Sequence, residues 1–225
     1  MLSEMFFKLW AKGLIQLGIF ETLYMTVISS FFAYLIGLPL GIILSITEPN
    51  GIRPTPWVNR ILGFIVNFFR SIPFVILMVA MLPVAKFILG KSLGNGAVIV
   101  MLIIAAAPYV ARMVEGSIKE VNAGVIEAAQ SMGCTNLQII MKVLLPEAKP
   151  ALIHGAVISM VTILGYSAMA ATIGGTGLGQ IAIIYGHQRS NADITWICVF
   201  LTVIIVQVIQ IVGTYIARKT DKRIK

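Results

Sequence analysis

The sequence has few charged residues. Only 12% of its 225 residues are Asp, Glu, Lys or Arg, whereas 58% are hydrophobic. A water-soluble domain of this length needs more polar surface, so the composition predicts an integral membrane protein. Acidic residues are the scarcest, nine against 17 Lys and Arg, and the net charge is +8. The excess of basic residues falls mainly in short loops and a basic C-terminal tail, where it sets the topology and favours contact with anionic lipid. A nucleic-acid partner is therefore not needed to explain the positive charge.

Cysteine is almost absent. Cys134 stands in a polar interval and Cys198 in an apolar run, so no disulfide is expected between them. The first 20 residues also lack the apolar core and the small-residue cleavage site of a signal peptide. We expect an interfacial helix over residues 1–20 that leads into the first span.

Long apolar runs are what the sequence has in abundance. Five are long enough to cross a hydrocarbon core of about 30 Å as helices. They cover residues 22–46, 61–82, 97–114, 151–173 and 194–216. Because these runs are continuous rather than alternating, they predict helices. The predicted fold is therefore all-α, a polytopic membrane protein with five transmembrane helices.

Lys and Arg are divided unequally between the two sides of these predicted helices. One side carries eleven and the other five, and Arg70, inside the second run, is counted on neither. The eleven are Arg53, Arg60, Arg112, Lys119, Lys142, Lys149, Arg218, Lys219, Lys222, Arg223 and Lys225; the five are Lys8, Lys12, Lys86, Lys91 and Arg189. Cytoplasmic loops are enriched in basic residues. The N-terminus is therefore expected outside, and the C-terminus, with a basic tail over residues 218–225, in the cytoplasm.

The polar interval between the third and fourth runs predicts two short helices that meet at a glycine. Apolar residues recur at helical spacing on both sides of Gly133. Asn122 is a suitable N-cap, Gly133 suits the left-handed residue that ends a helix, and Thr135 with Gln138 predicts a capping box. Pro146 ends the second helix or turns it into the next span. Neither helix can bury its apolar face alone, so the membrane helices, a partner or both must cover it.

This interval, residues 115–149, is called the elbow below, and it contains a spaced motif. The motif reads Glu127-Ala128-Ala129, then Gly133, then Val143-Leu144-Leu145-Pro146. It resembles the EAA loop of bacterial ABC-importer permeases, whose pattern has Ile where Val143 stands. In that family the loop docks into a cytoplasmic ATPase subunit. The resemblance implies that Glu127, Ala128, Ala129, Gly133, Leu145 and Pro146 form the ATPase-coupling site, with Glu127 as a polar anchor and the alanines permitting close approach.

Four further segments make the resemblance more specific than the ABC-importer permeases as a whole. They are Phe69-Arg70-Ser71-Ile72-Pro73-Phe74, Ala107-Pro108-Tyr109-Val110-Ala111-Arg112-Met113-Val114-Glu115, Lys142-Val143-Leu144-Leu145-Pro146-Glu147-Ala148 and Gly165-Tyr166-Ser167-Ala168-Met169. Together with the elbow they resemble the methionine ABC-importer permease family over nearly the whole chain. The resemblance implies a multi-pass protein of the bacterial cytoplasmic (inner) membrane, with a type I ABC importer transmembrane domain over residues 21–217.

The same resemblance implies partners. Five helices are too few to enclose a polar path alone, and the family arrangement is a homodimer with two copies of a cytoplasmic ABC ATPase. ATP and Mg²⁺ would bind the ATPase, so no cofactor is expected on this chain. An extracytoplasmic methionine-binding protein, expected to be a lipoprotein, would deliver the small-molecule substrate, D- and/or L-methionine.

Four residues are candidates for the translocation path or its gate. Tyr166, Ser167 and Met169 follow Gly165 past the middle of the fourth run, where a helix can loosen, and a flexible thioether can close a pore and reopen it. Ordinary helix packing is the alternative for these three. Arg70 is costly inside hydrocarbon and so is a functional candidate. The alternative for Arg70 is snorkelling to headgroups or pairing with a backbone carbonyl.

Catalysis and stand-alone transport are the rival functions. The sequence has no carboxylate pair, metal-ligand cluster or nucleophile constellation, so no enzymatic activity is expected. Gly90-Lys91-Ser92 resembles the end of a phosphate-binding loop, but Ala85 stands where that motif needs a glycine. A secondary transporter needs internal repeats and ionisable groups near the midplane, and no clear repeat is present. Within the ABC superfamily, the alternative is a permease for another amino acid or small polar solute.

Overall fold

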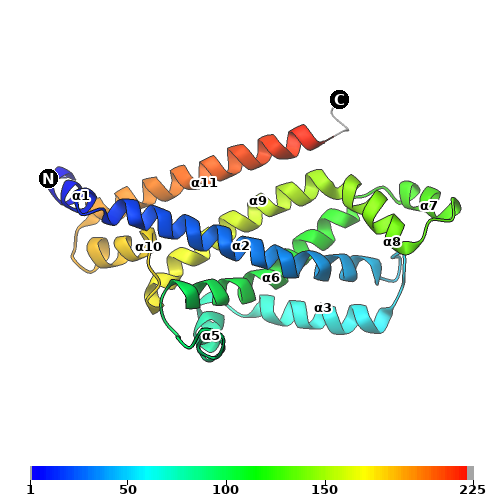
Figure 1. The fold of residues 1–225 in the computed structure, drawn as a ribbon, viewed down its shortest axis with the longest axis horizontal. Coiled ribbons are helices and arrows are strands. Elements are labelled where there is room, and N and C mark those ends of the chain that lie inside the picture. Colours follow the sequence, from blue (N-terminus) through cyan, green and yellow to red (C-terminus); the bar gives the residue numbers. More distant parts are fainter. Residues whose placement is uncertain (1, 222–225) are drawn as a thin grey trace. The chain divides into compact units, whose positions relative to one another are not determined.

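The computed structural model describes residues 2–221, with the side chains of residues 7–221, as helices joined by short turns (Figure 1). The helices are α1 (Leu2–Ala11), α2 (Leu14–Ile46), α3 (Pro56–Ser71), α4 (Phe74–Ala80), α5 (Leu82–Leu89), α6 (Asn95–Lys119), α7 (Ala123–Ser131), α8 (Asn136–Ile139), η1 (Ile140–Leu144), α9 (Leu145–Met169), η2 (Ala170–Ile173), α10 (Leu178–Ile181), η3 (Ala182–His187) and α11 (Ala192–Thr220). No strand occurs within residues 2–221, which confirms the all-α prediction. Lys222, Arg223 and Lys225 of the predicted basic tail lie outside the described residues.

Four helical segments are long and apolar enough to cross a membrane: α2, α6, the run 136–173 and α11. Helices α3 and α4 add a fifth span only if they are counted together across a break. The predicted second span, residues 61–82, is therefore present only as a broken span. The break falls at Ile72 and Pro73, because proline has no N–H to donate and disfavours helical backbone at the residue before it.

The N-terminal segment also differs from the single helix expected over residues 1–20. Helix α1 ends at Ala11, a two-residue turn follows, and α2 begins at Leu14, well before the predicted start of the span. Leu9 of α1 and Ile15 of α2 are buried in one apolar cluster. This shared cluster fixes the turn between the two helices.

The described residues form two compact units. Of the described residues, the first unit takes 2–32, 72–106 and 160–209, and the second takes 33–71, 107–159 and 210–221. Helices α2, α6, α9 and α11 contribute to both units. The elbow belongs wholly to the second unit.

The first unit is held by an apolar cluster and by one glycine-rich turn. The cluster consists of Leu9, Ile15, Leu178, Ile181, Ile194 and Cys198. Beside it, the backbone N–H of Leu178 donates to Thr22 Oγ1 at 2.9 Å. Gly177 has φ +98°, and a Cβ there would lie 2.6 Å from Thr22 Oγ1. Only glycine fits this turn, which lets α10 pack against the first half of α2.

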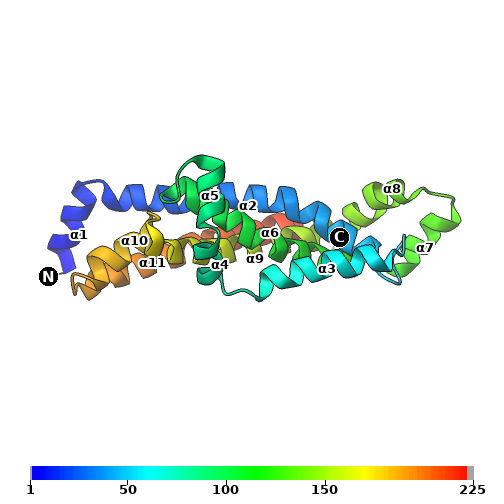
Figure 2. The same cartoon turned by 90° about the horizontal axis from the view of Figure 1, so that it is seen from below.

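In the second unit, α2, α3 and α6 meet around Leu44, Val66 and Ala111, all of which are buried. The turn between α2 and α3 is closed by hydrogen bonds. Asn59 Nδ2 donates to the Leu44 carbonyl at 2.7 Å, and the Arg53 N–H donates to the Ile46 carbonyl at 3.0 Å. Helices α7 and α8 lie side by side in this unit (Figures 1 and 2).

Candidate functional site

The first elbow helix, α7, begins and ends as the sequence predicts. Asn122 is its N-cap, and its side-chain oxygen accepts from the Gly124 N–H at 2.8 Å. Gly133 follows with φ +76°. The Gly133 N–H donates to the Gln130 carbonyl and the Cys134 N–H to the Ala129 carbonyl, at 2.9 and 3.1 Å. This pair of bonds is a Schellman motif, which places a left-handed glycine just after a helix.

The second elbow helix starts with the predicted capping box. The Thr135 N–H donates to Gln138 Oε1 at 2.8 Å, and the Gln138 N–H donates to Thr135 Oγ1 at 3.4 Å. Of the two outcomes predicted at Pro146, ending the helix is wrong, because the helical structure continues past it into the next span. Helix α8 continues through the π-helical turn η1 into α9, so one helical run extends over residues 136–173. A π-turn shifts the hydrogen-bond register, and this shift accommodates the N–H that Pro146 lacks.

The predicted coupling residues differ in their exposure. Glu127, Ala128 and Gly133 are exposed, whereas Ala129 is only 2% exposed. Pro146 is exposed and Leu145 is half-buried. Ala129 therefore packs inside the unit, where its small side chain lets α7 approach the rest of the elbow, and it does not offer a surface to a partner.

A group of exposed apolar side chains was not among the predicted coupling residues. Val125, Met132, Leu137 and Met141 are 43%, 76%, 69% and 58% exposed. We call these four residues the elbow face. Their helical spacing was visible in the sequence, but the spacing did not show which side of each helix the unit covers. Exposed apolar side chains in one segment make that segment a candidate for contact with a partner.

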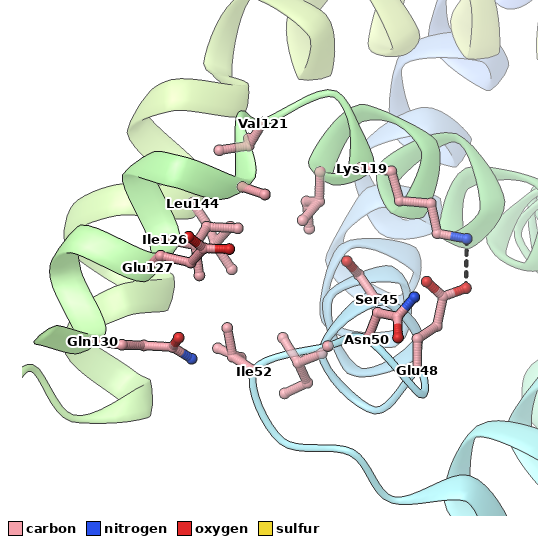
Figure 3. A pocket seen from close by; sticks show the side chains of 14 residues that line it. Ser45, Glu48, Asn50, Ile52, Lys119, Val121, Ile126, Glu127, Gln130 and Leu144 are labelled. Carbon is pink, nitrogen blue, oxygen red and sulfur yellow. Dashed lines mark hydrogen bonds and ion pairs between the residues drawn. The ribbon is translucent and has the colours of Figure 1, made fainter.

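A cleft of ≈ 320 Å³ separates α7 from the turn between α2 and α3. Glu127 and Gln130 extend into it from α7, and Ser45 and Asn50 line the opposite wall (Figure 3). Among the described residues, none is joined to the Glu127 carboxylate by a hydrogen bond or ion pair. The Glu127 carboxylate is exposed and therefore accessible to a partner.

The rim of the cleft carries a chain of ion pairs that sequence reasoning missed. Lys119 Nζ lies 2.5 Å from Glu48 Oε1 and 2.9 Å from Glu115 Oε1. Arg112 Nη1 lies 2.6 Å from Glu115 Oε2, and Arg112 Nη2 donates to Asn67 Oδ1 at 2.9 Å. The Glu115 side chain is 5% exposed. The spacing of Arg112, Glu115 and Lys119 in the sequence could have indicated the ion pairs among them, because residues three and four apart share a helix face.

The predicted path residues lie on two elements. Tyr166 of α9 stacks on Phe74 of α4, with ring centroids 4.3 Å apart and planes 6° apart. Ser167 is buried and donates to the Leu164 carbonyl at 2.7 Å, whereas Met169 is 48% exposed. All of these belong to the first unit. Arg70 lies in the second unit, exposed at the C-terminal end of α3.

The helix around Tyr166 is regular beside Gly165. Helix α9 runs regularly through Gly165 to Met169 and changes to a 3₁₀ helix at Ala170. The role of Tyr166, Ser167 and Met169 in a path or gate stays a prediction. The change of helix type falls immediately after Met169, before the chain reaches Gly174.

The fold and the elbow define a membrane subunit of a binding-protein-dependent transporter. Residues 37–225 match the family model described as the binding-protein-dependent transport system inner membrane component, and the chain belongs to this family. It is 46% identical over 212 residues to a probable D-methionine transport system permease protein of Vibrio cholerae, covering 94% of each chain. It is 45% identical over 204 residues to the methionine import system permease protein of Bacillus subtilis, covering 91% of this chain and 92% of that one.

A solved structure is similar over the same extent. The chain superposes on one chain of the MetNI methionine ABC transporter, in an inward-facing conformation, with a TM-score of 0.91 and 46% identity. The match covers 93% of this chain and 97% of that one. The sequence-based assignment to the ABC-importer permeases is thereby confirmed.

Proposed function

We propose that this chain is the permease subunit of an ATP-driven importer that carries methionine across the bacterial cytoplasmic membrane. The observation that carries the proposal is the 46% identity to the Vibrio cholerae relative over 94% of both chains, together with an elbow that keeps the EAA-type spacing. No group of three or more His, Cys, Asp or Glu within the described residues could hold a metal ion. The chain's role is translocation, and ATP and Mg²⁺ bind a separate ATPase subunit.

The importer is a homodimer of this chain with two ATPase copies on its cytoplasmic side and a methionine-binding protein outside. The N-terminus lies outside and the C-terminus inside. Support for this orientation comes from the basic residues, of which eleven stand on the predicted cytoplasmic side and five on the other. The elbow then faces the cytoplasm, where the ATPase is.

The elbow face docks onto the ATPase. Met132 and Leu137 supply most of its exposed apolar surface, and Glu127, accessible in its cleft, is the polar anchor. Burying apolar side chains that are exposed in the free subunit favours association by about 25 cal/mol per Å². Ala128 and Gly133, both exposed and small, let the partner approach closely, while Ala129 supports α7 from beneath.

The helical run over residues 136–173 carries elbow displacement to the path. It starts at the elbow face, passes Leu145 and Pro146, and reaches Tyr166 and Met169 without a break. Met169 gates the path, because its thioether is exposed and flexible. Ser167, bonded within its own helix, packs α9 in place beside the gate. Arg70, exposed at the C-terminal end of α3, is a further candidate path residue.

Uptake of labelled methionine into proteoliposomes tests the proposal. The vesicles hold this chain with its ATPase, the binding protein is outside, and ATP is enclosed or omitted. We expect uptake only with ATP, and competition by unlabelled methionine but not by other amino acids. ATP-independent uptake would refute the coupled importer in favour of a stand-alone transporter. ATP-dependent uptake of a different solute would keep the architecture and overturn the substrate.

A further inference from the structure

The cleft leaves few ties between the elbow and the turn that joins α2 to α3. Glu127 and Gln130 face Asn50 and Ile52 across the cleft, and no hydrogen bond or ion pair between described residues joins these two pairs of side chains. The charged contact at the rim is Lys119–Glu48, at 2.5 Å. Lys119 is the last residue of α6, and α7 begins at Ala123. An ion pair therefore ties the base of the elbow to the α2–α3 turn.

The turn itself is firmly connected to both of its helices. The Thr55 N–H donates to the Thr47 carbonyl at 3.1 Å, and Asn59 of α3 donates to Leu44 of α2 at 2.7 Å. A displacement of Glu48 would therefore also displace the ends of α2 and α3. The hydrogen bonds leave the turn little freedom to absorb the displacement locally.

Glu115 connects the same ion pair to the side of α3. Its buried carboxylate takes Lys119 on one oxygen and Arg112 on the other, at 2.9 and 2.6 Å. Arg112 then donates to Asn67 Oδ1 and to the Gly63 carbonyl, both on α3, at 2.9 and 3.3 Å. The chain Glu48–Lys119–Glu115–Arg112 therefore links three helices at the base of the elbow.

We propose that Glu48, Lys119, Glu115 and Arg112 are positioning residues of the translocation cycle, which make the ends of α2, α3 and α6 move with the elbow as one body. The inference rests on the proposed function. When the ATPase displaces the elbow, Lys119 and Glu48 pass that displacement to α2 and α3. Without the pair, the elbow moves, the cleft changes its width, and ATP is hydrolysed with little transport. The elements that couple two sites are connected physical networks of this kind.

The test measures methionine uptake and ATP hydrolysis in the same proteoliposomes, with the complete importer. The variants are Lys119→Met, Glu48→Gln and their combination, with Lys119→Arg as the conservative change. Lys219→Met is the matched control, because Lys219 is exposed near the end of α11 and no described residue forms an ion pair or hydrogen bond with its side chain. The amount of assembled importer is quantified for each variant.

We expect Lys119→Met and Glu48→Gln to lower uptake per ATP at least about fivefold, the lower end of typical coupling between sites. ATP hydrolysis per assembled importer stays near that of the unaltered importer. The combined variant should be no worse than either single one, Lys119→Arg should restore coupling, and Lys219→Met should leave the ratio unchanged. If Lys119→Met does not assemble, Glu48→Gln carries the test, since it alters the partner at the turn and leaves Lys119 bonded to Glu115.

Other outcomes overturn the inference. An unchanged ratio in Glu48→Gln shows that the pair transmits nothing, whether or not total activity falls. If the loss of uptake per ATP in the combined variant equals the product of the two single losses, the two residues act separately. If the unaltered importer shows no ATP-dependent methionine uptake, the proposed function fails and the inference fails with it, and that result is read before any variant is compared.

Discussion

Replacing Glu115 with glutamine should destabilise the second unit strongly. The Glu115 side chain is 5% exposed and its two oxygens bind Arg112 and Lys119, at 2.6 and 2.9 Å. Glutamine keeps the shape of the side chain but removes its charge. Arg112 and Lys119 would then lose the carboxylate that they share, and each would keep a positive charge beside a neutral amide.

The size of the effect follows from the exposure of the partners. Removing one partner of a fully buried ion pair costs about 3–5 kcal/mol, and exposed pairs contribute about 0–1 kcal/mol. The side chains of Arg112 and Lys119 are 25% and 45% exposed, so water partly solvates the cations left behind. We expect Glu115→Gln to cost about 2–4 kcal/mol of the free energy of unfolding. Glu48→Gln, at a carboxylate that is 32% exposed, should cost about 1 kcal/mol or less.

Thermal unfolding in detergent, followed by tryptophan fluorescence, measures the difference. At about 2–4 °C per kcal/mol for a chain of this length, Glu115→Gln should lower the midpoint by about 4–16 °C and Glu48→Gln by less than about 4 °C. Lys219→Met should leave it unchanged. Equal shifts for Glu115→Gln and Glu48→Gln would refute the reasoning, because they would mean that burial of the shared carboxylate does not decide the cost.

Three further predictions concern local features. Gly133→Ala has open space for its Cβ, so it should lose only about 1–2 kcal/mol of stability, the cost of a left-handed backbone, and Gly133→Asn should lose less. Amide hydrogen exchange in α7 measures this difference, and equal protection in both variants would contradict it. Thr135→Ala should cost about 1 kcal/mol by removing the capping box, which amide hydrogen exchange in α8 would show as faster exchange; unchanged exchange would contradict this. Tyr166→Leu should lose about 0.5–1.5 kcal/mol of stacking on Phe74 that Tyr166→Phe keeps, measured by thermal unfolding; a midpoint lowered equally in both would point to the hydroxyl instead.

The parts of the elbow that depend on local chemistry were predictable. A helix cap is decided within four or five residues, so Asn122, Gly133 and Thr135 could be read directly from the sequence. The long apolar runs were equally readable, because span length and composition are local properties. The break at Pro73 was signalled by the proline, but the sequence did not show that it would end α3 outright.

The remaining features depend on contacts that are distant in the sequence. Helical spacing grouped Ala129 with Met132, yet the unit buries the first and exposes the second. The outcome at Pro146 depended on a π-turn that no residue pattern announces. Lys119 pairs with Glu48 across 71 residues, so nothing local identified the partner. In each case tertiary packing decided between arrangements that the sequence allowed equally.

The elbow face is the proposed link between ATP hydrolysis and transport. The direct measurement is ATP-driven methionine uptake, together with retention of the ATPase, by an importer carrying Met132→Ser and Leu137→Ser. These changes remove the two most exposed apolar side chains of the elbow face and add no charge. We predict that the ATPase dissociates and uptake is lost, while Lys219→Met retains both. An importer that keeps its ATPase and its ATP-dependent uptake after both substitutions would contradict the account.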